Sequence, residues 1–241
     1  MTIRLKINVE NPQPRHLARA AQVLAQGGLV IYPTDTAYGL GCDIYSKRAI
    51  ERIYLLKHMD RKRPLSFVCA DLSDISRYAA IDNAQYRILR YHLPGPYTFI
   101  LPATKEVPKI LTSRTRTVGI RVPKHPVCMA LVSELGHPLV STTTSMYLHL
   151  QNTGNRNSNL DQRFVTAFDL DEEQRKTPMN DEDDHEEIFS DPDVIEQRFG
   201  HGVDLILDVG VLNFALSSIV DLTGPLPSIV RQGIGELSAL R

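Results

Sequence analysis

Apolar residues recur at helical spacing near the start of the chain and then give way to a short apolar run. Between Leu17 and Leu24 the spacing is three and four residues, which predicts a helix. Asn11-Pro12 is the expected start of this helix, and Gly27-Gly28 is its expected end. The apolar run at 29–32 that follows predicts a buried strand.

The same alternation of helical and extended patterns continues along the rest of the chain. Ser46 is the expected cap of a helix that ends at Lys57, and Asp71 is expected to begin a polar helical stretch. Further helices are predicted at 83–92, 126–135 and 191–199, and further strands at 65–70, 97–101, 118–122, 139–142, 203–209, 219–222 and 229–230. Alternating strands and helices predict an α/β fold with a twisted, mixed β-sheet and flanking helices.

The periodicity disappears between residues 151 and 190. The stretch from Asp169 to Glu187 holds ten acidic residues against Arg175 and Lys176, a net charge of −8. Such a segment has little apolar surface to bury, so we predict a flexible acidic insertion at 151–190 within a single domain spanning 1–241. Within it, the patch at 164–168 could form a short element.

The charge outside this acidic stretch is +7, since the whole chain carries −1. A basic body of this kind predicts a basic cleft that binds an anion such as a nucleotide or RNA. The alternative is that these are scattered, solvated surface charges.

Composition narrows the class of protein. The chain has 241 residues, of which 42% are hydrophobic and 23% charged, as in ordinary globular proteins with one substantial core. No apolar run approaches the roughly 20 residues of a membrane span. The N-terminus is polar, the eight histidines are dispersed, and Cys42, Cys69 and Cys128 are far apart. These features predict a cytoplasmic protein with no membrane segment, disulfide framework or metal site.

Small hydroxyl side chains follow the first predicted strand. Thr34 and Thr36 lie in the segment Pro33-Thr34-Asp35-Thr36, where a strand end would place their oxygens at a cleft. Hydroxyls and loop amides in such a place suit carboxylate, phosphate or carbonyl oxygens. An ordinary turn, in which Asp35 bonds its own backbone, is the alternative.

Eight segments in order resemble the YrdC-like family of threonylcarbamoyl-adenylate synthases over almost the whole chain apart from the insertion. These segments are GGLVIYPTDTAYGLG from Gly27, Lys57, RPLSF from Arg63, PGPYTFILPA from Pro94, TVGIRVPKHP from Thr117, PLVST from Pro138, SSIVDL from Ser217 and VRQG from Val230.

The resemblance implies a reaction of ATP, L-threonine and bicarbonate, with Mg²⁺ accompanying ATP, that gives threonylcarbamoyl-AMP and pyrophosphate for N6-threonylcarbamoyladenosine (t6A) modification of tRNA. It implies a threonine-side set of Thr34, Arg121 and Ser217. It also implies a nucleotide-side set of Lys57, Thr117, Ser141, Thr143 and Arg231. Two alternatives stay open: a salt bridge at a strand end for Arg121, and complementation of a helix dipole for Lys57.

Three positions depart from the family pattern. Met59 replaces the second member of a Lys-x-Arg pair that holds phosphates, Val68 replaces a histidine, and Ser145 replaces an asparagine. Loss of one charge-assisted phosphate contact costs about 1.5–3 kcal/mol, and Arg61 or Arg63 are possible substitutes.

These departures make the chain most similar to the YciO-type branch. They predict an adenylate-forming enzyme with a modified, weakened site that takes threonine or another amino acid. The alternative is a non-catalytic protein that binds double-stranded RNA or tRNA in the same basic cleft.

Overall fold

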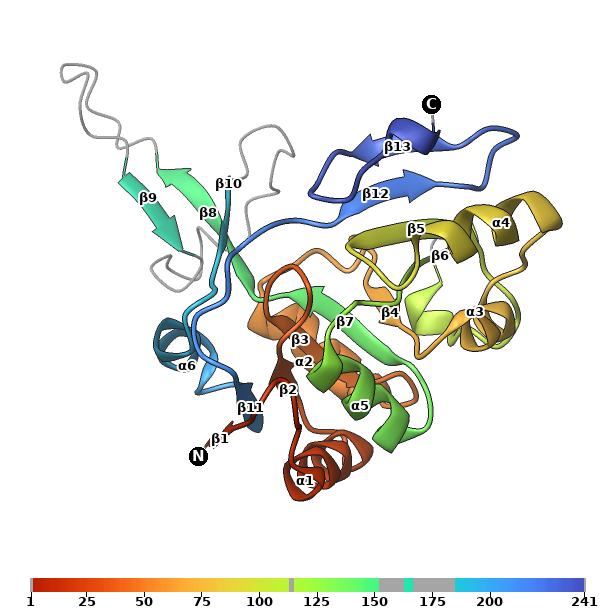
Figure 1. Ribbon diagram of the computed structural model, residues 1–241. Coiled ribbons are helices and arrows are strands. Elements are labelled where there is room, and N and C mark those ends of the chain that lie inside the picture. The colour runs from red at the N-terminus through yellow and green to blue at the C-terminus, as the bar shows by residue number, and fades with distance from the viewer. Residues whose placement is uncertain (1, 113–114, 152–162, 167–184, 241) are drawn as a thin grey trace, which may run out of the picture.

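A mixed ten-stranded sheet forms the centre of the computed structural model, which describes residues 2–112, 115–151, 163–166 and 185–240. Figure 1 shows this sheet with helices on both of its faces. In spatial order its strands are β1 (Ile3–Lys6), β11 (Leu205–Asp208), β2 (Val30–Tyr32), β3 (Gly39–Asp43), β7 (Leu139–Thr143), β4 (Ser66–Val68), β6 (Thr117–Arg121), β5 (Tyr97–Pro102), β12 (Ser218–Asp221) and β13 (Ser228–Arg231). Parallel and antiparallel pairs both occur, so the predicted mixed α/β fold is confirmed.

The helices are α1 (Pro14–Ala25), α2 (Lys47–Leu56), α3 (Leu72–Tyr78), α4 (Asn83–His92), α5 (Pro126–Leu135) and α6 (Pro192–Phe199). A second, three-stranded sheet has the order β10 (His185–Ile188), β8 (Ser145–Gln151) and β9 (Arg163–Thr166). Among the residues that the structure describes, no helix has both the length and the apolar character needed to cross a membrane.

The central sheet carries a hydrophobic core on each face because side chains alternate along a strand. In β2, Val30 and Tyr32 pack in the cluster that contains residues of α1 and α5, whereas Ile31 packs in the larger cluster with residues of α2 and α6. α1 and α5 lie together on one side of the sheet in Figure 1. Phe67 of β4 likewise belongs to the larger cluster. The smaller cluster covers only part of its face, which leaves room for a site.

Local signals predicted most helix ends correctly. The Ser46 hydroxyl accepts a hydrogen bond from the Ala49 amide at 3.3 Å, and Lys57 is the C-cap of the same helix. α1 is an exception, since it begins at Pro14 with Gln13 as its N-cap rather than at Asn11-Pro12. The Asn11 amide instead donates to the Asn8 side-chain oxygen at 2.8 Å in a preceding turn. Pro12 and Pro14 both suit the first helical position. Pro14 occupies it because the turn at Asn11 precedes the helix.

Several strands were not predicted. β1, β3, β8 and β10 have weak strand signals, and in β3 two of five residues are glycines. β9 falls in the patch for which a short element was suggested, and β10 lies in the predicted insertion. Residues 152–162 and 167–184 lie outside the described residues, so the flexibility predicted for the insertion stays a prediction.

Candidate functional site

Small polar side chains replace apolar ones on one face of the central sheet. Ser66 in β4 lies opposite Ser141 in β7 and opposite Gly119 in β6. Their strand neighbours Phe67 and Val140 point to the larger core on the other face. A side chain at Gly119 would meet the Ser66 hydroxyl at 3.2 Å. Small residues therefore keep this part of the face open.

A cavity of about 470 Å³ lies over this polar area. Its lining joins strand ends that are distant in sequence and comprises Met59, Arg63, Pro64, Ser66, Thr98, Arg121, Ser141, Thr142, Thr143, Ser217, Ile219 and Arg231. Three of these residues are arginines, and none of the lining residues found in the described part of the chain is acidic. The structure thus forms the predicted basic cleft and brings Arg121, Ser141, Thr143, Ser217 and Arg231 together.

Arg121 lines the cavity and also forms an ion pair. One of its terminal nitrogens lies 3.2 Å from Asp35 Oδ1 and donates to Thr36 Oγ1 at 2.9 Å. The side chains of Arg121 and Asp35 are only 13% and 10% exposed. Arg121 Nε is buried and has no hydrogen-bond partner among the described residues. The salt bridge considered as an alternative is therefore present, with Asp35 at one edge of the guanidinium, while Arg121 also lines the cavity.

Thr34 does not line the cavity. Its buried hydroxyl donates to the Ala37 carbonyl at 2.5 Å and accepts weakly from the amides of Thr36 and Ala37 at 3.2 and 3.3 Å. It also lies 3.1 Å from Thr36 Oγ1. These contacts form the turn that places Asp35 and Thr36 against Arg121. Thr34 therefore affects the cavity by positioning these two neighbours.

Ser217 and Arg231 form the side of the cavity that belongs to β12 and β13. Arg231 Nε and one terminal nitrogen donate to the Ser217 carbonyl at 3.1 and 3.0 Å. The buried Ser217 hydroxyl lies 3.2 Å from the same terminal nitrogen and 3.0 Å from Thr98 Oγ1. These hydrogen bonds fix the plane of the Arg231 guanidinium, a cation that lines the cavity.

Lys57 lies behind the cavity wall. The residue is 2% exposed, and its ammonium donates to Thr142 Oγ1 at 3.1 Å, the Thr143 carbonyl at 2.9 Å and Ser145 Oγ at 2.8 Å. Thr142 and Thr143 line the cavity, whereas Lys57 does not. Lys57 therefore holds the junction of β7 and β8 in place from behind.

Ser141 is fixed by a buried tyrosine that the sequence analysis did not assign to the site. The Tyr32 hydroxyl donates to Ser141 Oγ at 2.6 Å. Burial raises the pKa of Tyr32 well above its usual value, so the phenol remains a donor. The ring passes over β3, where a Cβ on Gly41 would lie 2.7 Å from a ring carbon and 3.0 Å from the Val140 carbonyl.

Gly41→Ala should therefore destabilise the fold by about 1–3 kcal/mol, because the ring must shift and Ser141 loses its donor. The matched control is Gly224→Ala, whose added Cβ would have its nearest neighbour at 3.7 Å. Urea unfolding of both variants measures the difference. Equal stability of the two variants would contradict this account of Tyr32.

The remaining predicted residues are divided between the cavity and other places. Arg63 lines the cavity, and Arg61 is exposed and does not. Met59 occupies part of the wall, as its family position implies, whereas Val68 is buried in the core beneath α5. Thr117 stands at the opposite end of β6 from Arg121, with its hydroxyl 3.3 Å from Thr115 Oγ1.

Arg63→Gln should weaken binding of an anionic ligand about ten-fold, because it removes one charge-assisted contact. Arg61→Gln changes the net charge equally but should alter affinity less than two-fold, since an exposed charge outside the cavity is screened. Isothermal titration with ATP compares the two variants. A larger loss in Arg61→Gln would reverse the assignment of the substitute cation.

Ser66 and Thr98 were missed by sequence reasoning. Ser66 is the first residue of β4 and Thr98 is the second of β5, and each is a lone polar residue in an otherwise apolar segment, which is the signal that could have found it. No group of three or more His, Cys, Asp or Glu side chains suited to a metal ion occurs among the described residues. The lining alone therefore offers no acidic cage for a cation.

Residues 22–183 match the family model described as "Telomere recombination", which covers the Sua5, YciO and YrdC proteins. The chain belongs to this Sua5/YciO/YrdC family. It is 33% identical to a protein of Escherichia coli K12 named "Uncharacterized protein YciO" over 232 residues, which cover 96% of this chain and 95% of that one. It is 36% identical over 134 residues to a threonylcarbamoyl-AMP synthase of Halorhodospira halophila, which cover 55% of this chain and 70% of the synthase.

Solved structures agree with this family membership. The crystal structure of E. coli YciO aligns over 100% of both chains with a TM-score of 0.80 and 33% identity. The structure of P. abyssi Sua5 in complex with L-threonine aligns over 97% of this chain and 57% of that one, with a TM-score of 0.74. At 21% identity, the Sua5 match shows that the fold is shared. The family's enzyme members and the YciO proteins are thus built on one scaffold.

Proposed function

We propose that the basic cavity binds ATP and an amino acid, threonine or another, and forms a carbamoyl-adenylate from them and bicarbonate with release of pyrophosphate. The observation that carries the proposal is the grouping of Arg63, Arg121 and Arg231 around a row of hydroxyls on one open sheet face. The threonylcarbamoyl-AMP synthase relatives and the Sua5 complex with L-threonine support it at the level of the family. The product of this chemistry would feed tRNA modification.

The two ends of the cavity suit the two substrates. Arg121, held on one edge by Asp35 and Thr36, can offer its remaining N–H groups to the amino-acid carboxylate. Arg63 and Arg231 can neutralise the triphosphate, and the Ser141 and Thr143 hydroxyls can bond phosphate or ribose oxygens. Neither assignment requires a covalent nucleophile, because positioning and charge stabilisation supply the rate.

The amino group first reacts with bicarbonate to form a carbamate with loss of water. A carbamate oxygen must then reach the α-phosphorus of ATP while pyrophosphate leaves. The arginines compensate the negative charge that grows on the leaving group. Mg²⁺ would bind together with ATP, as part of that substrate. The described residues of the cavity lining contribute hydroxyls and arginines and include no acidic side chain to hold the cation.

The altered positions predict a weaker site. Met59 occupies the wall where the family pattern has an arginine, and its thioether leaves one phosphate contact unmade. Ser145 is engaged by Lys57, so its hydroxyl supports the wall. Val68 packs in the core and offers no polar contact to an amino acid. We therefore expect ATP affinity below that of a site with both clamp residues.

Pyrophosphate release from ATP, bicarbonate, Mg²⁺ and L-threonine tests the proposal, with threonine omitted or replaced by other amino acids in parallel. Amino-acid-dependent release that is lost in Arg231→Gln is the expected result. If no amino acid supports pyrophosphate release, the proposal that the protein catalyses this reaction is wrong. If ATP then also fails to bind while double-stranded RNA binds with a steep salt dependence, the cavity serves nucleic acid instead.

A further inference from the structure

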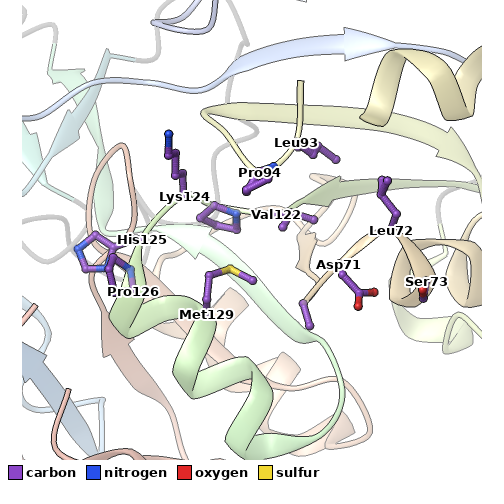
Figure 2. Close-up of a pocket in the computed structure, with 12 residues that line it drawn as sticks. Asp71, Leu72, Ser73, Leu93, Pro94, Val122, Lys124, His125, Pro126 and Met129 are labelled. Atoms are coloured by element: carbon purple, nitrogen blue, oxygen red, sulfur yellow. The ribbon is translucent and has the colours of Figure 1, made fainter. Parts of the chain in front are cut away.

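A second cavity, larger than the first at about 630 Å³, lies beyond Arg121 at the N-terminal end of α5. Its walls are mainly apolar and include Leu72, Leu93, Pro94, Val122 and Met129. Figure 2 shows Met129 pointing up from α5 toward Pro94 and Val122, with Leu72 across from it. The volume and the apolar lining are typical of sites that bury a small organic molecule.

The polar groups of this cavity are separated by charge. Asp71 and Ser73 lie at one end, and Lys124 and His125 lie at the other (Figure 2). The Asp71 carboxylate already accepts a hydrogen bond from the Asp74 amide at 2.8 Å, where it caps α3. Lys124, an exposed residue, brings a positive charge to the opposite end.

His125 adds an independent sign of a ligand at this end. The residue is 9% exposed and lines the cavity, and its Nδ1 atom is buried without a hydrogen-bond partner among the described residues. Burial lowers the pKa of His125, so the ring is neutral near pH 7 and can either donate or accept. A buried polar atom without a partner costs free energy unless a ligand group or water satisfies it.

α5 begins at the same place. His125 is its N-cap and gives it no side-chain hydrogen bond, and Pro126 is its first residue. The first turn of this ten-residue helix therefore presents its amides and the positive end of its dipole without a capping side chain. Lys124 and the helix start both favour negative charge at the end opposite Asp71.

We propose that this cavity is a binding site for a small organic anion with an apolar body. The body lies between Leu72, Val122 and Met129, and the carboxylate or sulfonate group lies toward Lys124, His125 and the start of α5. The site is distinct from the 470 Å³ cavity, since no described residue lines both, and Asp35 connects the two. Asp35 Oδ1 lies 3.2 Å from the Arg121 guanidinium, and its Oδ2 accepts from the Lys124 amide at 2.8 Å.

Fluorescence titration with 8-anilinonaphthalene-1-sulfonate, without ATP or amino acid, tests this site separately from the proposed reaction. We expect saturable binding at one site. Lys124→Glu should weaken it about three- to ten-fold through charge repulsion at a partly exposed position. Lys105→Glu makes the same charge change at an exposed residue that does not line the cavity, and should alter the affinity less than about two-fold.

Met129→Glu places a carboxylate in the apolar body of the site and should weaken binding more than about ten-fold. Leu226→Glu is its control, because Leu226 is 77% exposed in the β12–β13 connection, away from the cavity. Binding of N-phenyl-1-naphthylamine, which lacks the sulfonate, should also be lost in Met129→Glu. Its affinity should be unchanged in Lys124→Glu. Circular dichroism confirms that each variant is folded.

Three results would overturn the proposal. The first is a wild-type protein that binds neither probe saturably. The second is a greater loss in Leu226→Glu than in Met129→Glu, which would place the probe on the exposed hairpin. The third is equal affinity of the sulfonate probe for Lys124→Glu and Lys105→Glu, which would mean that the anionic group does not lie at this end of the cavity.

Discussion

Lys57→Met is expected to destabilise the fold by about 2–4 kcal/mol, because the buried ammonium makes hydrogen bonds that methionine cannot replace. Those bonds join the C-terminal end of α2 to Thr142, the Thr143 carbonyl and Ser145 at the start of the second sheet. Methionine has a similar length and fills the space, so the change removes bonding more than volume. The Thr143 carbonyl would lose a charged donor at 2.9 Å.

Thermal and urea unfolding measure this effect, and Lys47→Met at the exposed start of the same helix is the control. For a chain of this size, the loss corresponds to a Tm lower by about 4–16 °C, whereas the control should change the free energy of unfolding by less than about 0.5 kcal/mol. ATP affinity should fall in parallel, since Thr142 and Thr143 line the cavity. A large loss of ATP affinity with unchanged stability would instead mean that Lys57 contacts the phosphates directly.

Local patterns predicted the scaffold because the forces that end helices act within a few residues. The Ser46 hydroxyl bonds an amide three residues away, and Gly136 adopts a φ of +78° to end α5. Position in the sequence likewise put Lys57 at a helix end. Whether its ammonium faced a phosphate or the chain itself depended on Ser145, 88 residues away. No local pattern carries that information.

The sequence predicted those cavity-lining residues that belong to family motifs at strand ends. Arg121, Ser217 and Arg231 reach one cavity because β6, β12 and β13 converge there. Thr117 does not, because β6 carries it to the opposite end from Arg121. Thr98 was missed because it becomes part of the site only when β5 pairs with β12 and brings Ser217 to 3.0 Å. Pairing between distant strands decides such positions.

In the proposed reaction, Arg121→Gln is expected to reduce adenylate formation by about 10- to 150-fold and also to lower the stability of the fold, because it combines two losses. If Arg121 binds the amino-acid carboxylate as proposed, that carboxylate loses a charged donor worth about 1.5–3 kcal/mol. The Asp35 side chain, 10% exposed, also loses its ion-pair partner. An uncompensated buried charge costs about 3–5 kcal/mol, so the free energy of unfolding should fall as well.

The double variant Asp35→Asn/Arg121→Gln separates these two losses. Removing both charges takes away the penalty of an unpaired carboxylate, so stability should recover most of the way toward that of the wild type. Adenylate formation should not recover, since no cation faces the substrate at that position. Asp35→Asn alone should keep kcat within about ten-fold but raise KM for the amino acid, because Arg121 remains charged and loses only its orientation.

The matched control is Arg116→Gln, which removes an exposed arginine that follows Thr115 outside the cavity and should leave stability and turnover unchanged. Pyrophosphate release and urea unfolding of the four variants and the wild type complete the comparison. Recovery of activity in the double variant would show that Arg121 only neutralises Asp35, and the carboxylate of the amino acid would then require another partner. Recovery of stability without activity would place Arg121 in contact with substrate.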